Sequence, residues 1–177
     1  MSEISRVALF GKLNKLGYQA IEGATVFCKM RGNPYVELVH WFHQILNNQD
    51  SDLHHIVKHY GIDPGRLSAD MTRALDALPR GATAISDLSE HLENAVERAW
   101  TYGSLMFNAS RGRTGHLILG MLKTPTLRNQ LFEMSGEWKK VKPDDFAENF
   151  AEVVAASPEE AMSAPAGGGA SPGEASG

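Results

Sequence analysis

Four histidines have a spacing that could bind a metal ion. His55 and His59 are separated by one helical turn, and His40 and His43 are almost as close. A protein metal site usually needs three or four ligands, and no third ligand stands at a convincing spacing from either pair. A small helical enzyme that uses these histidines with a metal or a haem stays an alternative, but solvated histidines at the edge of a core are the simpler interpretation.

Two further features resemble chemical sites without matching one. Cys28 lies on a predicted apolar helix with no activating partner at a suitable spacing, so we interpret it as a small buried side chain. The run 112–115 is only faintly similar to a phosphate-binding loop, and the chain lacks the G-x-x-x-x-G-K-S/T pattern. We therefore expect no catalytic residue, metal or other cofactor in this chain, and no enzyme activity of its own.

The composition of the 177 residues limits the classes of partner. The formal net charge is -4 and the isoelectric point is about 6.0, without a basic stripe, which argues against a nucleic-acid partner. No apolar run approaches the roughly 18 residues of a membrane span, and residues 1–6 lack a signal-peptide pattern. A single cysteine, Cys28, excludes an internal disulfide and fits a reducing compartment. We expect a cytoplasmic protein without membrane contact.

Most of the chain shows the apolar period of α-helices, and no segment alternates convincingly as a strand would. The first predicted helix is long: its apolar face runs from Leu9 to Phe27, and Gly32 with the following Asn-Pro stops it. The hydrophobic fraction of 42% is enough for a real core. Further helices are expected at about 36–46, 51–60, 64–78, 88–102, 116–122, 125–132 and 143–154, which gives about eight helices in two groups of four.

Several helix starts are marked by capping residues. Asp50 or Ser51 can cap the third predicted helix, and Asp63 followed by proline is a typical N-cap and first helical position. Asp87 with Glu90 has the spacing of a capping box before the fifth helix. These signals divide the chain into the two groups of helices.

The two groups repeat one phrase. A helix rich in small residues, a loop, and a helix that opens with histidine occur at 20–46 and again at 92–122. A repeated unit of this size rarely buries its apolar face alone, so the two copies are expected to share one core around a pseudo-twofold axis. His40 and His116 occupy equivalent positions, which indicates a structural role at the helix start, such as a bond to a loop carbonyl.

The start of the first helix is apolar on more than one face, from Val7 to Leu16. Such a helix must be covered on several sides. One side can pack within its own repeat. The other is either buried internally as well or forms a groove for an amphipathic helix of a partner, which docks through anchors at helical spacing.

The doubled four-helix unit resembles the N-terminal domain of Clp/Hsp100 AAA+ unfoldases. The resemblance is carried by Arg31-Gly32-Asn33-Pro34-Tyr35-Val36-Glu37-Leu38-Val39-His40 in the first copy and by Gly115-His116-Leu117-Ile118-Leu119 in the second. The stretch 33–42, with the apolar start before Leu13, is most similar to the ClpV type. The likeness covers roughly residues 5–156, and the segment 103–113 is longer than in the family's tidier form.

The resemblance implies a domain organisation and a partner. We expect an all-α domain at 1–156, with repeats at about 5–79 and 84–156, and a flexible Ala/Gly/Ser/Pro linker at 157–177. ClpV-like proteins are ATPases that disassemble contracted type VI secretion sheaths, and this domain grips the N-terminal helix of the larger sheath subunit. ATP and magnesium belong to AAA+ modules outside this chain, and the full protein is expected to be a hexamer.

From the resemblance we predict that the sheath helix docks between the start of the first helix and the fifth helix. The apolar anchors and the polar groups that set orientation are Leu9, Phe10, Leu13, Leu16, Ile85, Leu88 and Leu92, with Glu22, Asp87 and Glu93 at the rim. Two alternatives remain. The chain could be the N-domain of another Clp unfoldase that binds an adaptor or client, or a self-contained adaptor whose tail has no neighbour.

Overall fold

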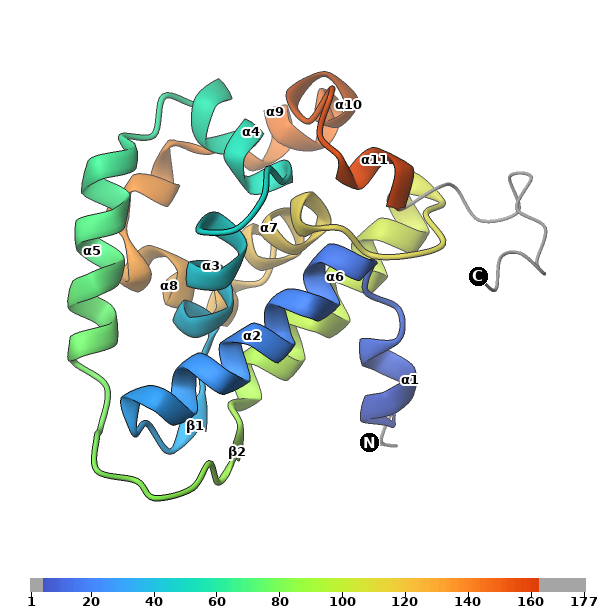
Figure 1. Cartoon of the computed structure of the whole chain (residues 1–177). Coiled ribbons are helices and arrows are strands. Elements are labelled where there is room, and N and C mark those ends of the chain that lie inside the picture. Colours follow the sequence, from blue (N-terminus) through green and yellow to red (C-terminus); the bar gives the residue numbers. More distant parts are fainter. Residues whose placement is uncertain (1–4, 163–177) are drawn as a thin grey trace.

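The computed structural model of the protein describes residues 5–162, and the regular secondary structure of this part of the chain is almost entirely helical (Figure 1). The all-α prediction is confirmed. Two strands of two residues each, β1 (Tyr35–Val36) and β2 (Asp87–Leu88), were too short for the sequence to predict. The helices are α1 (Arg6–Phe10), α2 (Lys15–Arg31), α3 (Leu38–Leu46), α4 (Asp52–His59), α5 (Pro64–Asp76), α6 (Glu90–Phe107), α7 (Thr114–Leu122), α8 (Pro125–Met134), the 3-10 helix η1 (Gly136–Lys140), α9 (Pro143–Glu148), α10 (Phe150–Val153) and α11 (Glu159–Met162).

The first predicted helix is wrong in one respect, because it is two helices. α1 ends at Phe10, and α2 begins after Asn14, whose side-chain oxygen caps it by accepting from the Gly17 amide. The segment between them pairs with a distant loop: the Asn14 amide donates to the Gly112 carbonyl over 2.8 Å, and the Gly112 amide donates to the Lys12 carbonyl. This long-range pairing overrides the helical period that the apolar residues suggest.

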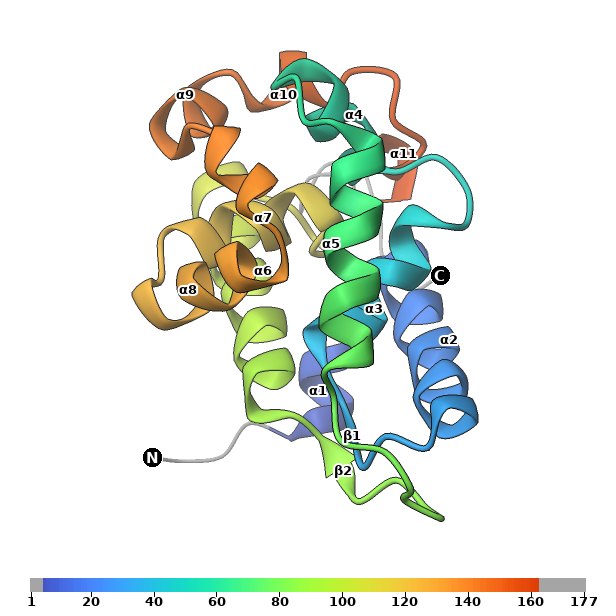
Figure 2. The same ribbon diagram turned by 90° about the vertical axis from the view of Figure 1, so that its left-hand side faces the viewer.

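Two crossed pairings relate the repeats. The segment that precedes α2 pairs with the loop before α7, through the bridge between Leu13 and Gly112. The segment that precedes α6 pairs in parallel with the loop before α3, through Tyr35 with Asp87 and Val36 with Leu88. Figures 1 and 2 both place the β1–β2 pair at one end of the molecule, beside the ends of α2 and α6. In each repeat a loop therefore pairs with the segment that precedes the long helix of the other repeat, as a pseudo-twofold relation requires.

The helices α3 and α7 begin in the same way. The Nδ1 atom of His40 accepts from the Glu37 amide over 2.8 Å, and the Nδ1 atom of His116 accepts from the Arg113 amide over 3.2 Å. Each ring thus satisfies one backbone donor that the first turn of a helix leaves open. The predicted structural role of the two histidines is confirmed, although the bonded group is a backbone amide and not a carbonyl.

Other helix starts follow their capping residues, with one exception. Ser51 caps α4, and Asp63 caps α5 by accepting from the amides of Gly65 and Arg66. The predicted capping box at Asp87 is wrong, because the N-cap of α6 is Ser89 and Asp87 lies in β2. Its backbone is held by the strand pairing, so the helix begins later.

Small residues bring the long helices together in the core. On α2 and α6 the alanines that face α3 and α7 are almost fully buried: Ala20, Ala24, Ala95 and Ala99. A Cβ atom on Gly120 of α7 would lie 2.9 Å from the Arg98 carbonyl of α6, so only glycine fits at this crossing. Trp41 and Trp138 are fully buried and fill the larger spaces. Cys28 is buried as predicted, and burial raises the pKa of its thiol.

The predicted linker begins too early. Within residues 157–162 the chain forms α11 (Glu159–Met162), and Ser157 and Glu159 are buried, so this segment is part of the folded domain (Figure 1). The prediction of one helical turn there is confirmed. The rest of the proposed linker, 163–177, lies outside the described residues. Among residues 5–162 there is no helix that combines the length and apolar character needed to span a membrane.

Candidate partner-binding groove

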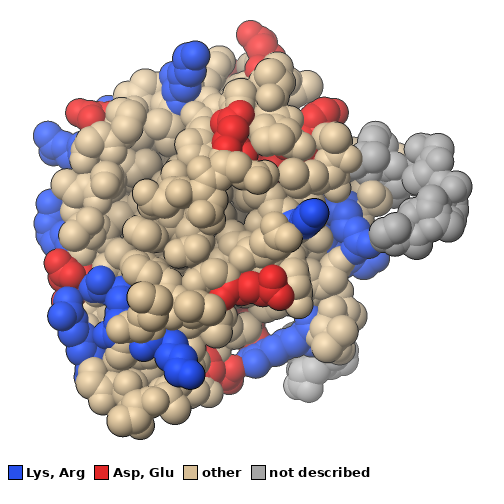
Figure 3. Space-filling model, viewed as in Figure 1, with Lys and Arg blue, Asp and Glu red and all other residues tan. Residues whose placement is uncertain are grey.

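A groove of about 790 Å³ is lined by α1, the start of α2, β2, the loop that follows α6 and the end of α11. The space-filling view shows a hollow beside α1, with Lys and Arg side chains next to it (Figure 3). The lining is mostly apolar with cationic groups at the edge. The residues that line the groove are Arg6, Val7, Phe10, Gly11, Leu13, Asn14, Lys15, Tyr18, Leu88, Arg111 and Met162.

The helix α1 forms one wall and is fixed to the body by side-chain bonds. The Arg6 guanidinium pairs with Asp87 of β2, with a 2.8 Å bond, and with Glu93 of α6. Arg111, from the loop before α7, donates to the Gly11 carbonyl at the end of α1. These bonds hold a helix of only five residues, which is too short to be stable in isolation.

Three of the predicted anchors lie together in this groove. Phe10 and Leu13 supply a floor that is less than one-tenth exposed, and half-buried Leu88 lines the same groove. Because these side chains come from α1, from the segment after it and from β2, the groove does join the start of the first repeat to the start of the second. The prediction that the two starts meet at one surface is supported by this geometry.

Other predicted anchors are not accessible in the groove. Leu92 is fully buried in the core, so it cannot contact a partner while the domain is folded. Leu9 and Leu16 are also buried and do not line the groove, because the break after α1 turns α2 in a new direction. Ile85 lies outside the lining, in the loop before β2, and Glu22 is exposed farther along α2.

The predicted acidic rim is already paired. Asp87 and Glu93 both bind Arg6, and the hydrogen bond from Arg6 lowers the pKa of the Asp87 carboxyl. These carboxylates thus hold α1 in place in the unbound domain. The charged side chains that line the groove itself are cationic: Arg6, Lys15 and Arg111.

The sequence prediction missed the most accessible lining residues. Val7 is 85% exposed and Tyr18 is 43% exposed, which is unusual for large apolar side chains in a groove wall. Val7 had a signal, since it adds a second apolar face to α1. Met162 had none, because it follows Leu13 by almost the whole length of the domain.

A buried polar cluster lies beside the groove at the start of α7. The Arg113 guanidinium makes a bidentate bond to Asp52, with distances of 2.7 and 2.9 Å, and both side chains are almost fully buried. Burial alone would lower the pKa of Arg113, but the paired Asp52 carboxylate raises it. Burial and the nearby Asp52 raise the pKa of Glu159 to about 7, although hydrogen bonds from Thr114 and the Asp52 amide act in the opposite direction.

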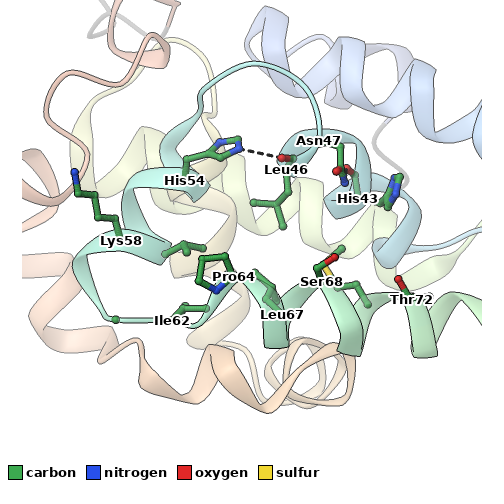
Figure 4. A pocket seen from close by; sticks show the side chains of 13 residues that line it. His43, Leu46, Asn47, His54, Lys58, Ile62, Pro64, Leu67, Ser68 and Thr72 are labelled. Carbon is green, nitrogen blue, oxygen red and sulfur yellow. Dashed lines mark hydrogen bonds between the residues drawn. The ribbon is translucent and has the colours of Figure 1, made fainter.

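A second, more enclosed cavity of about 540 Å³ lies within the first repeat, between α3, α4 and α5 (Figure 4). Leu46 and Leu67 are among its apolar walls, and His54 bonds to the Leu46 carbonyl at its margin over 3.0 Å. None of the predicted contact residues lines this cavity. It therefore does not coincide with the predicted site.

The histidines have other partners than a metal. Within residues 5–162 no group of three or more His, Cys, Asp or Glu side chains is placed to hold a metal ion. His40 and His116 cap helices, His55 bonds to Asp50 over 2.9 Å, and His43 stacks on Phe27. Burial lowers the pKa of His40 to about 4 and that of His116 to about 3, which keeps both rings neutral.

Comparison with known proteins gives consistent relatives. The AAA+ ATPase ClpV1 of Pseudomonas aeruginosa is 65% identical over 179 residues, which include all of this chain and 20% of ClpV1. A solved chain from work on the coevolution of the ATPase ClpV, the TssB–TssC sheath and the accessory HsiE protein is 67% identical. It has a TM-score of 0.87 and covers 90% of this chain and 98% of its own.

A more distant structure agrees in fold. A ClpV N-domain solved in complex with a VipB peptide has a TM-score of 0.77 and is 22% identical, over 90% of this chain and 97% of that chain. At this identity the likeness shows the fold alone. The present chain spans about 20% of the length of the curated relatives that it matches.

The family follows from the matched residues. Residues 12–124, which include the bridge at Leu13, the helices α2 to α5 and the α6–α7 pair, match the Clp repeat (R) N-terminal domain family. The similarity to ClpV expected from the sequence is confirmed. The chain belongs to the Clp repeat N-terminal domain family.

Proposed function

We propose that this chain is the recognition domain of a ClpV-type AAA+ ATPase and that it binds the N-terminal helix of the larger type VI sheath subunit. The observation that carries the proposal is the groove, in which exposed Val7 and Tyr18 stand beside the buried floor of Phe10 and Leu13. An apolar cleft of this kind fits one face of an amphipathic helix.

The relatives support the choice of partner. All of this chain aligns with part of ClpV1, at 65% identity. A ClpV N-domain of the same fold has been solved with a VipB peptide. The cationic groups at the groove edge, Arg6, Lys15 and Arg111, favour a partner helix with acidic residues beside its apolar face.

The expected affinity is modest. Burial of one leucine-sized side chain contributes about 1.5–3 kcal/mol, and association itself costs several kcal/mol. Two or three anchors contribute about 3–9 kcal/mol before this cost, so micromolar binding, about 8 kcal/mol net, also needs the charged contacts at the groove edge. Weak binding suits a recognition domain that must release each subunit after it has been engaged.

The wider role rests on parts of the protein outside this chain. In the proposed cycle the domain captures a sheath subunit after contraction, and AAA+ modules use ATP to pull that subunit from the sheath. The full protein is proposed to be a cytoplasmic homohexamer assembled through those modules. The present chain contributes recognition and no catalysis.

Calorimetric titration with a synthetic peptide of the sheath subunit's N-terminal helix tests the proposal. We expect saturable one-to-one binding with a negative heat-capacity change, the mark of apolar burial. The variant Val7→Asp should weaken binding at least tenfold, since it places a charge on the exposed groove wall. Leu105→Asp is the matched control, because Leu105 is 80% exposed and lies outside the groove.

Leu13→Asp is a less informative variant, because Leu13 is only 7% exposed and its loss would destabilise the fold. Equal effects of Val7→Asp and Leu105→Asp would place the contact elsewhere on the domain. No binding at high micromolar peptide would remove the sheath function and favour another adaptor or client of a Clp unfoldase.

A further inference from the structure

We propose that residues 157–162, here called the C-terminal latch, complete the partner groove through Met162 and that Glu159 positions the latch. The proposal rests on the proposed function where it concerns a partner, and on the geometry of the unbound domain where it concerns the latch. The latch crosses the molecule to lie beside the starts of α2 and α7 (Figure 1).

Glu159 fastens the latch to three distant segments. Its Oε1 atom accepts from the Asn14 side-chain amide over 2.9 Å and from the Thr114 amide over 2.7 Å. Its Oε2 atom accepts from the Asp52 amide over 2.7 Å and from the Thr114 hydroxyl. The side chain is fully buried, and all four partners donate to it. An ionised carboxylate can accept from all four donors at once.

The two backbone amides that donate to Glu159 also lie at the starts of helices. They belong to the first residues of α4 and α7, where helix amides lack partners within the helix. Glu159 thus supplies from the latch the caps that Asp52 and Thr114 need. Because these caps are buried, their loss cannot be repaired by water while the latch stays in place.

Met162 connects the latch to the groove. It packs against the core at the end of α11 and is part of the lining, together with Leu13 and Asn14. Asn14 both lines the groove and donates to Glu159. Release of Glu159 would therefore remove one wall of the groove and take one hydrogen bond from a second lining residue, Asn14.

The test compares neighbouring glutamates of the latch. In Glu159→Gln an amide nitrogen must face two donors, so the latch should leave its site. Glu160→Gln is the matched control, because Glu160 is exposed and its carboxylate accepts one hydrogen bond from Arg113. Met162→Ala keeps the fastening and removes only the groove wall.

Hydrogen exchange, methyl NMR and calorimetry are measured on the same three variants. In Glu159→Gln the Asp52 and Thr114 amides should exchange at least tenfold faster, and sheath-peptide affinity should fall about tenfold. In Met162→Ala the amide protection should stay as in the wild type while the affinity falls severalfold. Glu160→Gln should change both by less than about twofold.

The outcomes separate the latch from the sheath function. If the wild type binds no sheath peptide, the proposed function fails, and the latch is then judged on the unbound domain. In that case a shift of the Leu13 and Leu88 methyl signals in Glu159→Gln supports it. Unchanged amide protection in Glu159→Gln, or unchanged peptide affinity in both Glu159→Gln and Met162→Ala, overturns it. If Glu159→Gln fails to fold, Met162→Ala alone decides the groove contact.

Discussion

The starts of α3 and α7 share one backbone plan but lie in opposite electrostatic surroundings. In both, a histidine ring accepts from the N-cap amide, but the N-cap is half-buried Glu37 in the first repeat and buried Arg113 in the second. Burial raises the pKa of Glu37, while Arg113 is held as a cation by Asp52. The same histidine cap is therefore built on an acidic N-cap residue in the first repeat and on a basic one in the second.

The difference decides what covers each start. In the first repeat the His40 ring bonds to Asn33, whose side chain donates to the Pro79 carbonyl in the loop between the repeats. Neutral groups suffice there. In the second repeat the cation Arg113 is paired with buried Asp52 of α4 and with exposed Glu160 of the latch. The second start is consequently tied to the C-terminal end of the domain.

The largest expected effect comes from the charged N-cap of the second repeat. Arg113→Met should lower the free energy of unfolding by about 3–5 kcal/mol, because it leaves Asp52 buried without a counterion. Glu37→Gln, at the equivalent position of the first repeat, should cost about 1 kcal/mol or less. Urea denaturation measures both. Equal losses would contradict the contrast between the two starts.

Acidification should lower the stability of the domain through the two buried, neutral histidines. Their folded pKa values, about 4 for His40 and about 3 for His116, lie below the usual 6.5, so the unfolded chain binds more protons. Stability is therefore present above about pH 6.5 and falls as the pH drops toward 4. Together the two rings should lower the free energy of unfolding by about 5 kcal/mol between pH 7 and pH 4.5.

Glu159 acts in the opposite direction over the same range. Its folded pKa is raised to about 7, so its stabilising effect grows as the pH falls toward 4.5. The measured loss of stability should therefore be smaller than the two histidines alone would give. NMR titration should show the His116 ring titrating at a lower pH than His40. A ring that titrates near 6.5 would show that its helix start is open to water.

A smaller effect tests how closely α6 and α7 approach at the second start. A Cβ atom on Gly103 would lie 2.5 Å from the His116 ring, which is held between Phe107 and Phe150. Gly103→Ala should cost about 1–2 kcal/mol through overpacking. Cys28, the same number of residues after its own N-cap, is the control in the first repeat. Thermal unfolding of Cys28→Ala should show a change below about 1 kcal/mol.

The smallest effect concerns α1. Exposed ion pairs fasten this helix to the domain, whereas a buried carboxylate fastens the latch. Arg6→Gln removes the bonds to Asp87 and Glu93. It should change the free energy of unfolding by less than about 1 kcal/mol, and 1 M salt should abolish the difference from the wild type. Exchange of the Leu9 amide should nevertheless become faster. A large loss of stability would show that α1 is part of the core.

Local chemistry explains which elements could be predicted. Asp63 followed by proline gave the start of α5, and the paired histidines gave equivalent helix starts, because caps act within a few residues. The break after Phe10 could not be predicted in this way. It depends on Gly112, which lies far along the chain and pairs with the segment before α2.

The structure brings some of the predicted site residues together and separates others. Phe10, Leu13 and Leu88 meet in one groove, whereas Leu92 proved to be core. Apolar period identifies which side chains leave water, but it does not distinguish a wall of the core from a wall of a groove.

By itself, the sequence determined the helical repeats, the capped helix starts and the membership of a Clp-type family, since these depend on short-range spacing and composition. Only the tertiary structure decided that the chain breaks after α1, that Arg6 occupies the acidic rim, and that Glu159 and Met162 belong to the folded domain. The physical reason is the distance along the chain. Backbone pairing and buried charge neutralisation join residues that only the folded molecule brings together.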